Sequence, residues 1–267
     1  MLFVKKIHIL LVLSMLLLSS CAYQKEYSQV SRSGTLDEKY NFAVKAYDKQ
    51  DYRKAVELFE ELVPLYRGKD ILERLLYNVA YSYFYEKDYF MSAYYFRSLT
   101  RQFPNSQYLE EASYMSAYCK TLESPDFRLD QTATVEAIKQ LQLFINYYPN
   151  SRRSEEAGKL INDMREKLAL KAYNVANMYY RRSLYNAASI AYSNFLKDYP
   201  ESNVREQALY MMIKSRFLYA ENSIKEKQSE RYAKVIEGYE AFLRSFSDSK
   251  YRKEVDKYYK ESKLKKI

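Results

Sequence analysis

A repeated Tyr-x-x-Ala string constrains the fold of this 267-residue chain more than any other feature of its sequence. The tyrosines of successive copies are separated by 37, 37, 59 and 37 residues, and the fifth copy has Ile in place of Ala. The copies are Tyr40/Ala43, Tyr77/Ala80, Tyr114/Ala117, Tyr173/Ala176 and Tyr210/Ile213. A period of this length is typical of solenoid proteins, in which each repeat buries its apolar face against the next.

A second set of residues follows each copy at fixed offsets. After Ala80, a small residue (Ser92), an aromatic (Phe96) and a proline (Pro104) stand 12, 16 and 24 positions later, and the fourth copy repeats these offsets. Small residues let two antiparallel helices approach closely, the aromatic fills the space beside them, and proline ends the second helix. This is the tetratricopeptide (TPR) pattern. We therefore predict an all-α fold, an α-solenoid of five TPR-like helix–turn–helix repeats, with turns at Asp51-Tyr52, Asp88-Tyr89 and Leu184-Tyr185.

The departures from the 37-residue period predict where the solenoid is irregular. Eight extra residues in the third repeat surround Ser124-Pro125-Asp126, which predicts a loop. Fourteen more residues precede the fourth repeat. They amount to about four helical turns, which can lengthen a helix without rotating its buried face. They predict one elongated helix between repeats three and four, at about Ser154–Arg182. A ten-residue displacement in the fifth repeat predicts a charged loop near Ile224–Ser229.

The N-terminus has the pattern of an export signal. Lys5 and Lys6 precede an apolar run, Ile9–Leu18, that is too short to span a bilayer. The run ends in Leu18-Ser19-Ser20-Cys21, which resembles the bacterial lipobox, where cleavage before the cysteine accompanies acylation of its sulfur. We predict a lipoprotein signal peptide at residues 1–20 and a lipidated, flexible tether at 21–34 anchored through acylated Cys21. An ordinary signal peptide with a chance cysteine, or a buried N-terminal helix, is the alternative.

The composition argues against enzymatic chemistry. The one histidine, His8, lies in the predicted signal peptide, and the chain has only four glycines and two cysteines. Histidine-dependent catalysis, a glycine-rich phosphate loop and a cysteine-rich metal site are therefore not expected. Cys119 is expected to be a buried, inert thiol. We predict no enzymatic activity, no cofactor, no metal and, in the absence of a clustered arginine patch, no nucleic-acid partner.

Taken together, the lipobox cysteine, the five TPRs, the aromatic-Pro-x-Ser turns such as Phe103-Pro104-Asn105-Ser106 and the lengthened helix resemble the BamD (YfiO) family. The resemblance covers residues 21–260, essentially the whole mature chain, although the chain departs from it in its Tyr- and Lys-rich composition and degenerate last repeat. It implies an outer-membrane lipoprotein that faces the periplasm and serves as a scaffold of the β-barrel assembly (BAM) machinery. The implied partners are a BamA-like β-barrel subunit and the C-terminal segments of unfolded outer-membrane proteins. An envelope TPR lipoprotein that coordinates peptidoglycan or cell-division proteins is the alternative.

Tyrosine is the most over-used residue type, with 31 copies. First helices line the concave groove of a TPR stack, and tyrosine combines an apolar ring with a hydroxyl, which suits binding of extended peptides. We expect repeats one to three (35–149) to form the peptide-binding half, or else these rings to be inter-helix packing. The expected groove residues are Tyr40, Val44, Tyr47, Tyr77, Tyr81, Phe84, Tyr85, Tyr114 and Tyr118.

Repeats four and five (150–260) are expected to be the scaffold half, followed by a basic tail at 261–267. Cationic side chains recur here, either as a solvated face or as a docking surface for an acidic partner domain. The expected docking residues are Arg181, Arg182, Arg205, Lys214 and Arg216.

Overall fold

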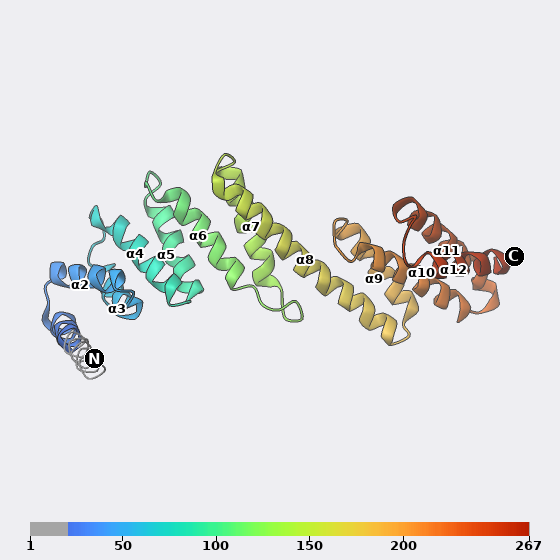
Figure 1. The fold of residues 1–267 in the computed structure, drawn as a ribbon, viewed down its shortest axis with the longest axis horizontal. Coiled ribbons are helices and arrows are strands. Elements are labelled where there is room, and N and C mark those ends of the chain that lie inside the picture. Colours follow the sequence, from blue (N-terminus) through green and yellow to red (C-terminus); the bar gives the residue numbers. More distant parts are fainter. Residues whose placement is uncertain (1–20, 267) are drawn as a thin grey trace, which may run out of the picture. The chain divides into compact units, whose positions relative to one another are not determined.

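The computed structural model describes residues 21–266, and every regular element in that part of the chain is a helix (Figure 1). Residues 21–33 form an N-terminal helix. The helices that follow are α2 (Leu36–Asp48), α3 (Tyr52–Leu62), α4 (Ile71–Tyr85), α5 (Tyr89–Gln102), α6 (Leu109–Leu122), α7 (Thr132–Tyr147), α8 (Arg152–Arg181), α9 (Tyr185–Asp198), α10 (Arg205–Glu221), α11 (Lys225–Ser245) and α12 (Arg252–Lys265). The five predicted helix pairs run from α2/α3 to α10/α11, so the α-solenoid of TPR-like repeats is confirmed.

The chain divides into two compact units. Unit 1 contains residues 21–123 and 143–154 of the described chain, and unit 2 contains residues 124–142 and 155–266. Within unit 1, consecutive helices from α2 to α6 pack on one another, and within unit 2 the same holds from α9 to α12.

The repeat motif is buried as the spacing predicts. The small residues Ala43 and Ala55 are fully buried in repeat one, and Ala176 and Ala188 are fully buried in repeat four. The aromatic at the second-helix position is fully buried as well, for example Phe96. Burying such a ring removes most of its apolar surface from water, which stabilises each repeat by about 2–3 kcal/mol before entropic costs.

The turns between paired helices share one backbone geometry. Gln50, Lys87 and Ser183 occupy equivalent positions and have φ values of 60°, 64° and 59°. In each turn two backbone N–H groups bond back into the preceding helix, as Lys87 N does to Phe84 O and Asp88 N to Tyr83 O, both at 3.0 Å. This is the Schellman arrangement, which satisfies the last carbonyls of a helix. The next helices then begin at Tyr52, Tyr89 and Tyr185, as predicted.

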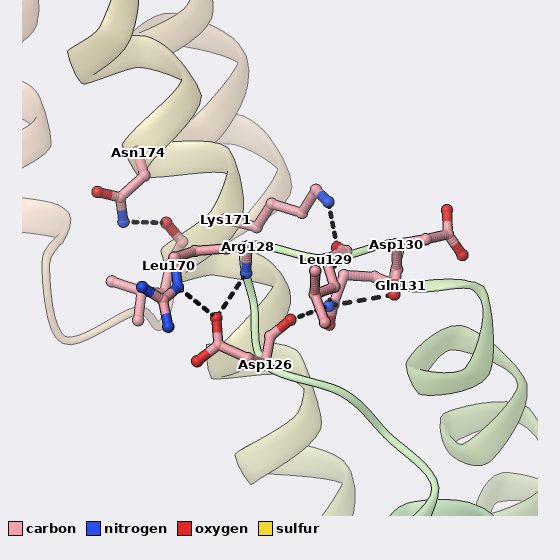
Figure 2. A network of polar contacts seen from close by, with 8 residues as sticks. All are labelled: Asp126, Arg128, Leu129, Asp130, Gln131, Leu170, Lys171 and Asn174. Carbon is pink, nitrogen blue, oxygen red and sulfur yellow. Dashed lines mark hydrogen bonds and ion pairs between the residues drawn. The ribbon is translucent and has the colours of Figure 1, made fainter.

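Two predicted irregularities are confirmed. α8 is a single 30-residue helix from Arg152 to Arg181, within two residues of the predicted bounds. Residues 124–131 form the predicted loop, which is held by its own polar contacts (Figure 2). Gln131 donates to the Asp126 and Leu129 carbonyls at 2.8 and 3.1 Å, and Lys171 of α8 donates to the Leu129 carbonyl at 2.5 Å.

The expected flexible tether is wrong for residues 21–33, which are helical and packed on α2 and α3. The Tyr23 ring stacks on Phe42 at 5.2 Å, Tyr27 lies 5.7 Å from the same ring, and Glu26 forms an ion pair with Lys45 at 2.6 Å. Tyr23 and Tyr27 lie on one helical face because they are four residues apart. That short aromatic pattern is the reason the segment folds.

One further expectation for unit 2 is also wrong. The charged loop near Ile224–Ser229 is instead the first turn and a half of α11, because the segment has no glycine or proline to interrupt a helix. The basic tail at 261–267 is helical through Lys265, since α12 continues. Ser262 is fully buried there, and Lys265 forms an ion pair with Glu221 at 2.5 Å.

None of the described helices is both long enough and apolar enough to cross a bilayer. The predicted signal peptide, residues 1–20, lies outside the described residues. Cys21 is exposed at the start of the N-terminal helix.

Candidate peptide-binding surface

Several tyrosines of unit 1 form a connected row of rings, most of them on the first helices of the repeats. The ring of Tyr52 lies between the rings of Tyr47 and Tyr85. Its centroid is 5.6 Å from that of Tyr47 and 4.5 Å from that of Tyr85, on which it is stacked. The Tyr81 centroid lies 6.0 Å from that of Tyr85, and the Tyr77 centroid lies 4.9 Å from that of Tyr81. Centroid separations of 4.5–7 Å are those of interacting aromatic pairs, so these rings are in continuous contact.

A branch of the same row reaches the third repeat. Phe84 lies 6.4 Å from Tyr81 and 6.1 Å from Tyr118, and Tyr118 stacks on Tyr114 at 5.9 Å. Tyr114 in turn meets Phe144 edge-on at 5.4 Å. Seven of the nine predicted groove residues thus join in one set, which we call the aromatic row: Tyr47, Tyr77, Tyr81, Phe84, Tyr85, Tyr114 and Tyr118.

The two other predicted residues lie apart from the aromatic row. Tyr40 is half-buried and packs edge-on against Phe59 at 6.4 Å, and Val44 is half-buried on α2. Sequence reasoning also missed rings that extend the set, because they lie outside the first helices; Tyr52 and Tyr108 are two of them. Tyr52 begins α3, and Tyr108 precedes α6 and stacks on Tyr77 at 4.3 Å.

An ion pair lies beside the aromatic row. Glu111 accepts hydrogen bonds from the hydroxyls of Tyr77 at 3.1 Å and Tyr81 at 2.6 Å, and it pairs with Arg153 at 3.1 Å. The Arg153 guanidinium also lies over the Tyr114 ring, 4.7 Å from its centroid. No sequence pattern distinguishes Glu111 from other acids in the first turn of a helix, or Arg153 from other residues that follow an inter-repeat loop.

The surroundings keep three hydroxyls of the row, those of Tyr47, Tyr77 and Tyr81, protonated. Burial and the neighbouring Glu111 carboxylate raise the pKa of Tyr77 to about 12, and burial together with the hydrogen bond to Glu111 raises the pKa of Tyr81 further. Burial also raises the pKa of Tyr47. These phenols therefore stay neutral at any physiological pH.

Exposure divides the row into an accessible and a covered part. Tyr85 has 45% of its surface exposed and Tyr114 only 5%, while Tyr47, Tyr77, Tyr81, Phe84 and Tyr118 are half-buried. The accessible part around Tyr85 can contact a ligand. The covered part packs against its neighbours and thereby holds the accessible rings in position.

The predicted docking residues of unit 2 do not form a single free surface. Arg205 donates to the Leu196 carbonyl at 2.9 Å, Lys214 pairs with Glu254 at 3.1 Å, and Arg216 donates to the Lys234 carbonyl at 3.0 Å. Burial lowers the pKa of Arg216. Arg181 and Arg182, at the end of α8, are exposed. Three of the five cations therefore tie helices of unit 2 together.

Cys119 is fully buried, with its Sγ 3.3 Å from Ser92 Oγ, and burial raises the pKa of its thiol to about 11. A thiol in this state is a poor nucleophile at neutral pH. Within the described residues, no group of three or more His, Cys, Asp or Glu side chains is arranged to hold a metal ion.

Comparison with known proteins adds a family to this geometry. Residues 32–233 match the family model YfiO, described as outer membrane lipoprotein. A protein of Aquifex aeolicus named as an outer membrane protein assembly factor BamD is 28% identical over 82% of this chain and 71% of its own length. The proteins named outer membrane protein assembly factor BamD in Neisseria meningitidis and Pasteurella multocida are 26% and 22% identical, over 76% and 73% of this chain and 82% and 77% of theirs. Among solved structures, the TPR2AB domain of yeast Sti1 aligns with 85% of this chain and 98% of its own, at 14% identity and a TM-score of 0.37.

Proposed function

Because the chain belongs to the YfiO family of outer membrane lipoproteins, whose relatives are named BamD, we propose that it is a lipid-anchored scaffold of the outer-membrane protein assembly (BAM) machinery. In this role it faces the periplasm and is not an enzyme. Unit 1 binds the C-terminal segments of unfolded outer-membrane proteins, and unit 2 docks a BamA-like β-barrel subunit, with Arg181 and Arg182 as its exposed cations.

The observation that carries the peptide-binding part is the aromatic row with its accessible end at Tyr85. An extended chain presents alternate side chains and unpaired backbone groups. The rings offer flat apolar contact area, and the phenol hydroxyls donate and accept hydrogen bonds at low entropic cost. Arg153 is a cation in contact with the row, and it suits the free carboxylate at the end of a C-terminal segment.

The test is the affinity of a ten-residue peptide that ends in phenylalanine and carries a free C-terminal carboxylate, measured by fluorescence anisotropy. We expect Tyr85→Ala to weaken binding by about 1–2 kcal/mol, as for an interface hot spot. Tyr94 is the matched control, because it is a tyrosine of unit 1 with 58% of its surface exposed and lies outside the aromatic row. Equal affinity of Tyr85→Ala and Tyr94→Ala would show that the row is packing only.

The anchoring part is tested separately by Cys21→Ala. We expect the variant to lose membrane retention, because two or more acyl chains are needed for stable anchoring and the cysteine is their attachment point. Fractionation of membranes and mass spectrometry of the N-terminus measure both outcomes. A processed Cys21→Ala protein that remains in the membrane fraction contradicts the lipoprotein assignment.

A further inference from the structure

A groove in unit 2 is separate from the aromatic row and from the cations considered above. It has a volume of about 960 Å³ and is lined by the first turns of α7, the middle of α8 and the loop between α9 and α10. Its apolar lining comes from Val135 and Ile138 of α7, Leu168 and Ala169 of α8, and Tyr199 and Pro200 of the loop. Val135 has 55% of its surface exposed, so its side chain is accessible to a ligand in the groove.

The charge around this groove is opposite to that of the protein. The chain has a formal net charge of +9, yet the groove carries four carboxylates, Asp163, Glu166, Asp198 and Glu201, against one cation, Arg165. Among the ion pairs of the described residues none includes these four acids. The rim is therefore complementary to a positively charged ligand.

Both walls of the groove are fixed before any ligand binds. On the α7 side, the loop that leads into α7 is attached to α8, because Lys167 donates to Ser124 Oγ at 2.7 Å and Lys171 donates to the Leu129 carbonyl (Figure 2). On the opposite side, Ser202 donates to Glu166 at 3.1 Å, which attaches the α9–α10 loop to α8. A preformed site loses less conformational entropy on binding than a mobile one.

We propose that this groove binds a cationic amphipathic helix of a partner protein. The groove is lined by helices and offers no strand edge, so an extended segment gains no backbone ladder there. Carboxylates accept hydrogen bonds and cannot donate them to a carbonyl, so they do not satisfy the C=O groups of an extended chain. A helix satisfies its own backbone, lays its apolar face on Val135 and Leu168, and directs lysine or arginine toward Asp163 and Glu201.

The probe is a 15-residue peptide of leucine and lysine, with leucine at i, i+3, i+4 and i+7 spacing, titrated against the full mature chain by isothermal calorimetry. Two variants address the two halves of the proposal. Val135→Asn removes apolar contact from an exposed site, and we expect roughly fivefold weaker binding. Asp163→Lys with Glu201→Lys inverts the rim, and we expect a loss of at least about tenfold together with a weaker dependence on salt.

Matched controls come from unit 2. Ile190→Asn changes an α9 residue with 54% exposure, and Glu226→Lys inverts an exposed acid of α11, and both should stay within about twofold of the parent protein. Three outcomes overturn the proposal: groove variants that bind the peptide like the parent, equal binding of a sequence-scrambled peptide that has no apolar face, or self-association of the chain that Val135→Asn abolishes. Failure of the peptide-binding role of unit 1 would leave all three readouts unchanged, since none depends on Tyr85.

Discussion

The tyrosine of the Tyr-x-x-Ala motif has a different environment in the first two repeats of unit 1 and in the repeats of unit 2. In unit 1, Tyr40 and Tyr77 are half-buried, whereas Tyr114 in the third repeat is 5% exposed, and in unit 2 Tyr173 and Tyr210 are only 7% and 6% exposed. Tyr210 is covered by Tyr251, which stacks on it at 4.3 Å, and Lys214 donates to its hydroxyl at 3.0 Å. One motif position is thus half-buried in the first two repeats and part of the core in the three that follow, and the neighbouring helices decide which.

This contrast predicts the largest effect. Tyr173→Ala removes a buried ring that lies 5.9 Å from Tyr192 and 5.8 Å from Phe195, so we expect a loss of about 3–5 kcal/mol of stability in unit 2. Tyr77→Ala, at the equivalent position of unit 1, should cost about 1–2 kcal/mol, because its ring is already partly in water. Hydrogen exchange measured on α4 and α8 assigns each loss to its unit, since repeat proteins need not unfold in one step. Equal losses in the two variants would remove the distinction between surface and core.

An effect of intermediate size on stability concerns the buried thiol of unit 1, Cys119, since unit 2 contains no cysteine. Burial raises the pKa of Cys119 from 9 to about 11, so the folded state disfavours the thiolate. The stability due to the protonated thiol is fully present below pH 9 and is lost as the pH rises toward 11. Urea unfolding at pH 8 and pH 11 should show that Cys119→Ala loses less stability over this range than the parent does, by on the order of 2 kcal/mol. An identical pH dependence in the two proteins would contradict the assigned pKa.

The same two units show what the sequence could predict. The repeat spacing predicted the helix pairs, the turns and the length of α8, because small residues at fixed offsets depend only on helix geometry. It did not predict the helix over 21–33, since that helix depends on Tyr23 reaching Phe42 of another helix. The contact between Glu111 and Arg153 joins residues 42 positions apart, and Lys214 and Arg216 were expected at the surface but bond to neighbouring helices. Pairings of this kind follow from the packing of helices and have no local signal.

The smallest expected effect tests whether the turns, in contrast to the tyrosines, are equivalent in the two units. Lys87 in unit 1 and Ser183 in unit 2 have φ values of 64° and 59° in the same Schellman turn, where side chains other than glycine are strained. Lys87→Gly and Ser183→Gly should each stabilise the protein by about 0.5–1 kcal/mol, because the relief of strain exceeds the entropy that glycine adds to the unfolded chain. Arg53→Gly, at an exposed position in the first turn of α3, is the control and should cost up to about 1 kcal/mol. Thermal unfolding of the three variants measures the differences. A gain of stability from Lys87→Gly without one from Ser183→Gly would mean that the strain in each turn, like the burial of each tyrosine, depends on its neighbours and not on the repeat itself.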